Sequence, residues 1–333
     1  MPDIIITGKG KEQHTFDAIV IGSGITGGLA AKDLTEKGLK VLLLERGRNV
    51  EHIKDYKYSG TDPWDLPHRN LVSQKEQADY EVQKNLYLFT EDSKDFMVKD
   101  SLHPYVQDKP FNWFRGYQVG GRSLLWSKHC YHWSERDFEA NQKEGIGIDW
   151  PIRYADLAPW YSYVEKYVGI SGNRDNLQQI PDGEFLPPFD MNVIDKHLRK
   201  RIKEKYAERD LIIGRMAILT EDHNGRSKCH GRNLCHRGCV FGAPYSSNVA
   251  AIPDAAKTGN LTIRPFSIVH SLIYDNKTRK ISGVNVIDSE TKETTEFFSR
   301  IVFLNASTLG STQILLQSAT PEWRIPAVCW DIT

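Results

Sequence analysis

The residues of this chain that could do chemistry fall into two groups, a glycine-rich turn followed by an acid and a cluster of cysteines. The turn, residues 22–27, has the G-x-G-x-x-G spacing. Gly22 allows a tight turn, Gly24 lets the backbone approach a pyrophosphate, and Gly27 lets a helix lie close to a strand. This spacing by itself is a weak indication of a dinucleotide site.

The elements around the turn strengthen the prediction. Ala18 to Ile21 and Val41 to Leu44 are short apolar runs, typical of strands buried in a parallel sheet. Between them a helix begins at Ile25 and Thr26, and its N-terminal N–H groups favour phosphate. Glu45 follows the second strand about twenty residues after the glycines, where a carboxylate accepts hydrogen bonds from a ribose. An ordinary glycine-rich turn would not explain Glu45, so the stretch predicts a dinucleotide site.

The residues after the acid favour FAD over NAD. Arg46 and Gly47 form an ending that is common in FAD-binding versions of this unit. Further along, Gly120 and Gly121 are adjacent and Ser123 follows, which indicates backbone pressed against a flat or charged ligand. An ordinary tight turn would give the same pattern, but the dinucleotide unit upstream favours the ligand.

The cysteine cluster has the spacing C-x5-C-x3-C at Cys229, Cys235 and Cys239, with Arg and Lys residues on both sides. Nearby cations favour thiolates, which bind metals. Three interpretations remain open: a three-iron, four-sulfur cluster on three thiolates, a zinc site completed by His230 or His236, and reduced cysteines without a ligand. Zinc is disfavoured because each histidine is adjacent in sequence to a cysteine.

Composition excludes several classes of function. The 333 residues, with 43 basic and 43 acidic side chains, give no electrostatic reason to expect nucleic acid or an anionic membrane as partner. The sequence contains no run of eighteen apolar residues, the length that would indicate a helix across a bilayer. The N-terminus lacks the features of a secretory signal, so the cytoplasm is the default location.

The chain is long enough for about two domains. We expect an N-terminal FAD-binding unit at 1–47, a lid or flavin-contacting segment at 48–130, a helical insertion with the cysteine cluster at 131–245, a return to the FAD-binding domain at 246–320 and an aberrant tail at 321–333. A stripe on the helix after Asp149 is expected to pack in a core, and residues 193–209 to form a charged, solvent-facing helix. The stripe consists of Leu157, Trp160, Tyr161, Val164 and Val168.

The order of these pieces resembles the glucose-methanol-choline (GMC) oxidoreductase family up to about Thr320. GSGITGG with LLLERG resembles the family's FAD unit, and VGGRSLLWS resembles its second flavin-contacting motif, in the form with Trp126 that occurs in sugar dehydrogenases. DWPIRYADLAPWYSYVEKYVGISG is similar to a segment of the same subgroup. Val269 lies where the family's adenine-contacting residue would fall. VFLNASTLGSTQILLQS, which includes Ala306, resembles the strand and turn that close on the FAD.

The resemblance implies an α/β fold, with an FAD-binding doubly wound (Rossmann-like) domain and part of a second α+β substrate domain. It implies FAD-dependent oxidation of CH–OH groups of sugars or glycosides. The cysteine spacing is similar to that of an insertion carrying a three-iron cluster in the flavin subunits of bacterial sugar and glucoside dehydrogenases. Those enzymes pass electrons to a c-type cytochrome and associate with a small partner subunit. Export together with such a partner would make the periplasm the alternative location. Leu125 stands where a relative with covalent flavin has histidine, which implies non-covalent FAD.

The chain departs from the family at its C-terminus. The family's catalytic His, which takes the hydroxyl proton while hydride goes to the flavin, lies in a later segment, so no catalytic residue is assigned here. When the residues from Trp323 onward are back-translated and read in another frame, from the third base of each codon, they can encode a string similar to the segment that follows in the family. We therefore expect a frameshift near Pro321 and a truncated product. The alternatives are a GMC alcohol oxidase that uses oxygen and a non-catalytic FAD-binding remnant.

Overall fold

The computed structural model of the chain describes residues 14–323, so most of the expected aberrant tail, residues 324–333, lies outside the described residues. The described part divides into two compact units. Unit 1 comprises residues 14–126, 236–238 and 246–323, and unit 2 comprises residues 127–235 and 239–245.

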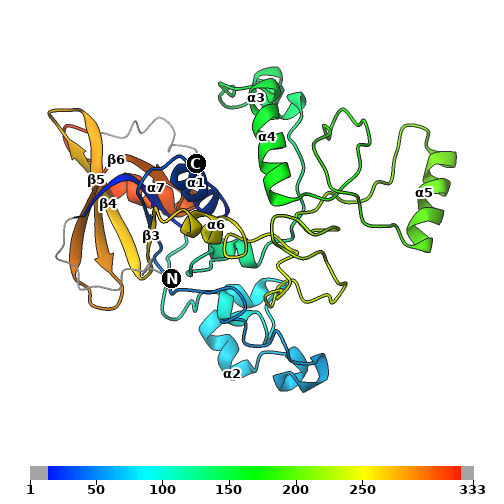
Figure 1. Cartoon of the computed structure of the whole chain (residues 1–333), viewed down its shortest axis with the longest axis horizontal. Coiled ribbons are helices and arrows are strands. Elements are labelled where there is room, and N and C mark those ends of the chain that lie inside the picture. Colours follow the sequence, from blue (N-terminus) through cyan, green and yellow to red (C-terminus); the bar gives the residue numbers. More distant parts are fainter. Residues whose placement is uncertain (1–13, 324–333) are drawn as a thin grey trace. The chain divides into compact units, whose positions relative to one another are not determined.

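Unit 1 contains a six-stranded sheet with the order β3-β2-β1-β6-β5-β4 (Figure 1). The strands are β1 (His14–Ile21), β2 (Val41–Leu44), β3 (Leu261–Arg264), β4 (Ser267–Asp275), β5 (Lys280–Asp288) and β6 (Thr294–Leu304). β1 pairs in parallel with β2 and β6, and β2 pairs in parallel with β3. β5 runs antiparallel to both β4 and β6. The predicted α/β fold with a Rossmann-like domain is confirmed.

Side chains of β1 and β2 alternate between the two faces of this sheet, as the pleat requires. On one face Ala18 and Val20 pack, with Val41 and Leu43, against α1 (Ile25–Glu36) and α6 (Ala251–Lys257). On the other face Ile19 packs with residues of β4 and β5 and of α7 (Thr308–Gln317). Both faces are therefore covered, which explains why the two strands read as continuous apolar runs.

β6 is one continuous strand of 11 residues with two different halves. Ile301 is 48% exposed. Because β5 pairs only with residues 294–298 of β6, the second half of β6 has a strand neighbour on one side alone, which is β1.

The segment between β2 and Trp126 is held by short helices and a small core. It contains α2 (Gln74–Gln77) and the 3-10 helices Pro63–Asp65, Pro67–Asn70, Ala78–Tyr80, Gln83–Asn85, Lys94–Phe96 and Gly121–Leu124. Tyr56, Tyr80, Phe96 and Leu124 belong to its buried cluster. The segment is thus a packed part of unit 1.

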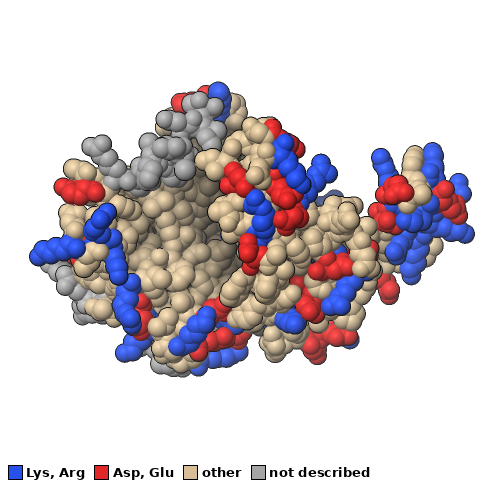
Figure 2. All heavy atoms as spheres, turned by 90° about the horizontal axis from the view of Figure 1, so that it is seen from above, with Lys and Arg blue, Asp and Glu red and all other residues tan. Residues whose placement is uncertain are grey.

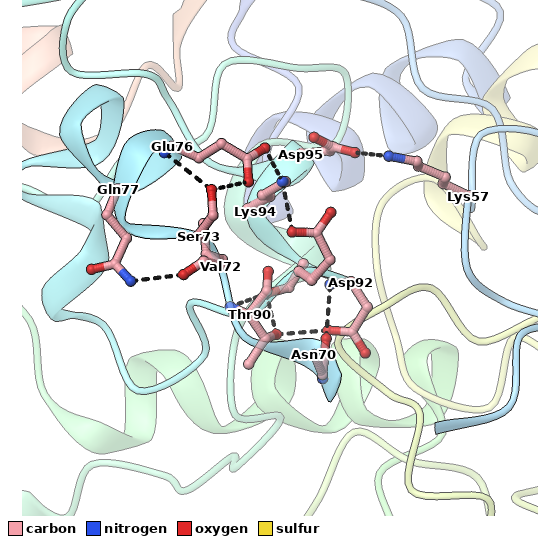
Figure 3. Close-up of polar contacts among 12 residues, drawn as sticks. Lys57, Asn70, Val72, Ser73, Glu76, Gln77, Thr90, Asp92, Lys94 and Asp95 are labelled. Carbon is pink, nitrogen blue, oxygen red and sulfur yellow. Dashed lines mark hydrogen bonds and ion pairs between the residues drawn. The ribbon is translucent and has the colours of Figure 1, made fainter. Parts of the chain in front are cut away.

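A buried polar network crosses the same segment (Figure 3). The Nζ atom of Lys94 lies 2.7 Å from Glu91 Oε2 and 2.5 Å from Glu76 Oε1. Lys94 and Glu91 are both buried. Nearby, the buried carboxylate of Asp92 lies 2.9 Å from the Nε atom of Arg237. These ion pairs connect parts of the chain that are not linked by pairing within a sheet or by a long helix.

Unit 2 contains α3 (Glu135–Glu144), α4 (Tyr154–Val168) and α5 (Val193–Lys205). The predicted helix at 193–209 is therefore present and ends at Lys205. None of its residues is buried, and its Lys and Arg side chains form a concentrated basic surface (Figure 2). Its solvent-facing character is confirmed. Among the described helices, none combines the length and apolar character needed to cross a bilayer.

The stripe predicted for α4 is only partly correct. Val168 is buried, but Trp160 is 65% exposed. The other buried residue of this helix is Glu165, whose Oε1 atom lies 2.6 Å from Nε2 of the buried His132. Its other oxygen accepts a hydrogen bond from the N–H of Glu184 at 2.9 Å. A carboxylate with these partners can be buried, and a periodicity of apolar residues does not reveal it.

Candidate functional site: a dinucleotide cavity

A cavity of about 620 Å³ lies within unit 1, and both glycine motifs line it. Most of the predicted cofactor residues are among its lining residues: Gly22, Gly24, Ile25, Thr26, Glu45, Arg46, Gly121, Ser123, Trp126, Val269 and Ala306. Gly27 and Gly120 are not, and both lie against other parts of the protein.

The first glycine motif has three different environments. Gly22 has a φ of +93°, and a Cβ there would lie 2.5 Å from the carbonyl oxygen of Asn305. A Cβ on Gly27 would lie 1.8 Å from the carbonyl oxygen of Gly22. Gly24 has no atom within 4 Å of its Cβ position and borders the cavity. Only Gly24 therefore leaves room for a ligand, while Gly22 and Gly27 hold the turn.

The helix α1 begins directly after Gly24 and has no side-chain cap. The first N–H groups of a helix have no partner within the helix, and the positive end of its dipole favours an anion. Ile25 and Thr26, in this first turn, line the cavity. The end of α1 is therefore suited to a pyrophosphate.

Glu45 is held in place by the protein itself. Its Oε2 atom accepts hydrogen bonds from the Ser23 hydroxyl at 2.5 Å and the Ser23 N–H at 3.2 Å. Its Oε1 atom accepts one from the N–H of Gly47 at 3.1 Å. Burial raises the pKa of Glu45 above its usual value, and the donors of Ser23 and Gly47 oppose that shift. The carboxylate has a fixed orientation at the cavity wall, and its contact with a ribose stays a prediction.

The second glycine motif lies against the first. Gly121 is so placed that a Cβ on it would lie 3.4 Å from the Cα atom of Gly24. Gly120 has a φ of +90°, and a Cβ there would lie 1.6 Å from Asn248 Oδ1. Ser123 donates a hydrogen bond to the carbonyl oxygen of Gly120 at 2.6 Å. The tertiary structure thus brings together two motifs that are far apart in the sequence.

One wall of the cavity was missed from the sequence. Residues 113–117 line it, and they lie shortly before the double glycine in the sequence. The Arg115 guanidinium lies 4.8 Å from the Trp113 ring centroid and forms a buried ion pair with Asp100 at 2.8 Å. The Arg46 guanidinium lies 3.9 Å from the Tyr117 ring centroid. The alternation of aromatic and arginine residues beside a glycine motif was the signal that could have revealed this wall.

Asn305 and Ser307 were also missed, although their neighbour Ala306 was predicted. Both line the cavity beside α7. The side-chain oxygen of Asn305 is buried and has no hydrogen-bond partner among the described residues. Ser307 has a φ of +62°, a strained conformation for a residue with a side chain. A buried acceptor without a donor and the open space at Gly24 both fit a polar ligand in this cavity.

The three cysteines lie in unit 2. Cys229 and Cys235 pack against a small apolar core that includes Leu219. The N–H of Gly231 lies 3.4 Å from the sulfur of Cys229. Burial raises the pKa of Cys235, while the buried ammonium of Lys128 lowers it.

These thiols do not make a recognisable metal site. Among residues 14–323, no three His, Cys, Asp or Glu side chains are arranged to hold a metal ion. His230, a ligand in the zinc alternative, packs on Phe241 with ring centroids 4.2 Å apart. The side chains as placed therefore do not fit a bound metal or cluster.

Two family models match parts of the chain. Residues 199–328 match the GMC oxidoreductase family model, and residues 20–78 match that of the NAD(P)-binding Rossmann-like domain. The large subunit of fructose dehydrogenase from Gluconobacter japonicus is 26% identical over 331 residues, which cover 93% of this chain and 55% of that protein. The gluconate 2-dehydrogenase flavoprotein of Pantoea cypripedii is 29% identical over 342 residues, covering 92% and 53%.

The chain is therefore similar to GMC oxidoreductases over most of its length. This similarity supports FAD as the cofactor of the chain. A solved structure of a formate oxidase from Aspergillus oryzae has a TM-score of 0.50 at 15% identity, covering 93% of this chain and 48% of that one, which supports the fold alone. The chain spans about half the length of the curated relatives it matches.

Proposed function

We propose that unit 1 binds FAD and that the whole protein oxidises a CH–OH group of a sugar, polyol or glycoside. The observation that carries this proposal is the meeting of the two glycine motifs at one cavity, in a chain whose residues 199–328 match the GMC oxidoreductase family model. Flavin, when bound, supplies the hydride acceptor. The substrate class is supported by relatives that are named fructose dehydrogenase and gluconate 2-dehydrogenase.

The chain's own residues have distinct parts in this proposal. Gly24 and the N-terminus of α1 would hold the pyrophosphate, and Glu45 would accept hydrogen bonds from the ribose. Gly121 and Trp126, in the second motif, would border the flavin. No described residue is assigned as the base that takes the substrate proton.

The test is an absorption spectrum of the purified chain under anaerobic conditions. Bands at about 370 and 450 nm, typical of oxidised flavin, are expected after FAD is added and unbound FAD is removed. Bleaching of the longer-wavelength band by a sugar or polyol would report hydride transfer. A chain that retains no flavin would contradict the proposal. A chain that retains flavin but is bleached by no sugar or polyol would favour the non-catalytic FAD-binding remnant.

An oxygen-using oxidase is the second candidate. It is supported by relatives that are named oxidases, among them 6'''-hydroxyparomomycin C oxidase of Streptomyces lividus, 22% identical over 94% of this chain. Under air, an oxidase would produce hydrogen peroxide in step with substrate consumption. A dehydrogenase would require an added electron acceptor.

We further propose, as a separate hypothesis, that electrons leave through an iron–sulfur cluster on Cys229, Cys235 and Cys239 to a cytochrome-type acceptor. This hypothesis requires the three thiols to come together when the cluster assembles, because their described positions do not form a metal site. Its support is the cysteine spacing and the N–H of Gly231 near a thiol. After anaerobic reconstitution we expect about three irons per chain. Cys239→Ser should lower the iron content. Cys130→Ser is the control, because burial raises the pKa of that thiol to about 12 and it lies outside the cluster. Equal iron in both variants, or none in the parent chain, would refute the cluster.

A further inference from the structure

A set of buried hydroxyl groups joins the two glycine motifs. Gly120 donates its N–H to the Ser23 hydroxyl at 2.9 Å, across 97 positions of sequence. The same hydroxyl donates to Glu45 at 2.5 Å. Ser23 is fully buried, so its hydroxyl makes both bonds without competition from bulk water.

A second connection reaches the same motifs from the chain after unit 2. The Ser247 hydroxyl donates to the carbonyl oxygen of Gly24 at 2.8 Å. The Ser247 N–H donates to the Ser123 hydroxyl at 3.1 Å, and that hydroxyl donates to the carbonyl oxygen of Gly120 at 2.6 Å. Ser123 and Ser247 are at most 1% exposed.

The two connections close a loop. Starting from Gly24, it passes through the neighbouring Ser23 to Gly120, then through Ser123 and Ser247 back to Gly24. We call these three serines, with the backbone of the two glycines, the serine ring. Ser23 and Ser123 line the cavity, whereas Ser247 does not.

We propose that Ser247 is a positioning residue of the dinucleotide site, and that the serine ring sets the two glycine motifs at their binding separation before the ligand arrives. This inference rests on the proposed FAD site. Gly24 lies at the place proposed for the pyrophosphate, and Gly121 at the place proposed for the flavin. A ligand that spans both motifs gains from their prior alignment, because less ordering remains to be done on binding.

The contacts predict different effects on two ligands. FAD would touch both motifs, whereas ADP carries the pyrophosphate but no flavin and would touch the first motif alone. Loss of the Ser247 hydroxyl should therefore weaken FAD more than ADP. Gly24 would not be left without a partner, because its carbonyl oxygen also accepts the N–H of Gly28 at 2.8 Å.

The experiment measures FAD and ADP dissociation constants for the full chain and for Ser247→Ala, well below their melting temperatures. FAD should bind about tenfold more weakly to the variant, equal to about 1.4 kcal/mol. ADP should change by less than about threefold, which is under about 0.7 kcal/mol. Ser246→Ala is a matched control, since the neighbouring Ser246 is also buried but its hydroxyl has no hydrogen-bond partner among the described residues. Its affinities should stay within about twofold of the parent's.

The possible results separate the two proposals. Equal losses for FAD and ADP, or an FAD affinity within twofold of the parent's, would overturn the positioning role. Failure of the parent chain itself to bind FAD would overturn the proposed function and the inference with it. If Ser247→Ala does not fold, Ser247→Cys replaces it, because a thiol is of similar size but a weak donor. This variant should also lose more affinity for FAD than for ADP.

Discussion

At the scale of single residues, the glycines of the first motif show how one residue type serves different purposes. Gly24 leaves open space at the cavity, whereas Gly27 is in contact with the backbone of Gly22. The spacing in the sequence assigns both to one motif. Their surroundings separate the glycine that admits a ligand from the one that permits helix packing.

Alanine substitutions at these two glycines should therefore affect different properties, the stability of the fold at Gly27 and the affinity for FAD at Gly24. Gly27→Ala places a methyl group 1.8 Å from a carbonyl oxygen and should destabilise the fold by about 3 kcal/mol. Gly24→Ala meets no atom within 4 Å and should cost about 1 kcal/mol or less of stability. It should nevertheless weaken FAD at least about tenfold. Urea unfolding and FAD titration measure both, and equal destabilisation by the two substitutions would contradict this account.

The pH dependence of stability should report on Glu45. Burial raises its pKa in the folded chain above the unfolded value of 4.5, so the folded chain binds more protons between these two values. Stability from this group is therefore greatest below pH 4.5 and is lost as pH rises through the folded pKa. Glu45→Gln removes this dependence.

Urea unfolding of both chains from pH 4.5 to 8 tests this sign. The stability advantage of the parent chain over Glu45→Gln should shrink as pH rises. An advantage that grows with pH would mean that the donors of Ser23 and Gly47 outweigh burial, and that the pKa of Glu45 is lowered.

At the scale of elements, the segment between β2 and Trp126 depends on buried polar contacts. Its helices are one turn long or little more, and such helices are not stable in isolation. Lys94 provides the positive charge between Glu76 and Glu91 (Figure 3). An ion pair with both partners buried is costly to break from one side.

Lys94→Met should accordingly destabilise the chain by about 3 kcal/mol, because it leaves the buried Glu91 without its cation. Lys84→Met is the matched control. Lys84 forms an ion pair with Glu81 at 2.8 Å whose carboxylate is 72% exposed, and its loss should cost less than about 1 kcal/mol. Equal effects of the two substitutions in urea unfolding would show that the Lys94 network does not hold the segment.

At the scale of the whole molecule, the residues of one unit come from distant parts of the chain. Unit 1 is assembled from three stretches, because the chain leaves it at residue 127, returns briefly at residues 236–238 and returns again from residue 246. All lining residues of the dinucleotide cavity belong to unit 1. Ligand binding should therefore slow hydrogen exchange at cavity residues of unit 1 that are far apart in sequence, and leave exchange in unit 2 unchanged.

Hydrogen exchange with and without FAD tests this division. At a hundredfold excess over its dissociation constant, FAD should add about 2.7 kcal/mol to the free energy of unfolding of the structure that binds it. Slower exchange is expected in α1, in the 3-10 helix Gly121–Leu124 and at the start of α7. The exposed helix α5 should exchange at the same rate in both samples. Protection of α5 equal to that of α1 would contradict the assignment of the cavity.

The sequence by itself determined what depends on local spacing. The apolar runs at β1 and β2, the glycine turn and the acid after it are properties of a short stretch, because strand pleat, turn geometry and helix packing act over a few residues. These patterns predicted the Rossmann-like unit, and most of the cofactor residues predicted from sequence motifs line its cavity. The charged helix α5 was readable for the same reason.

Only the tertiary structure decided the contacts between distant residues. The bond from Gly120 to Ser23, the ring closed by Ser247 and the wall at residues 113–117 depend on how packed segments meet. The exposure of Trp160 was misjudged, and the burial of Glu165 was not predicted, because periodicity describes one helix and carries no information about its neighbours. The spacing of the cysteines likewise did not determine whether their thiols converge, since that is fixed by the folded loop.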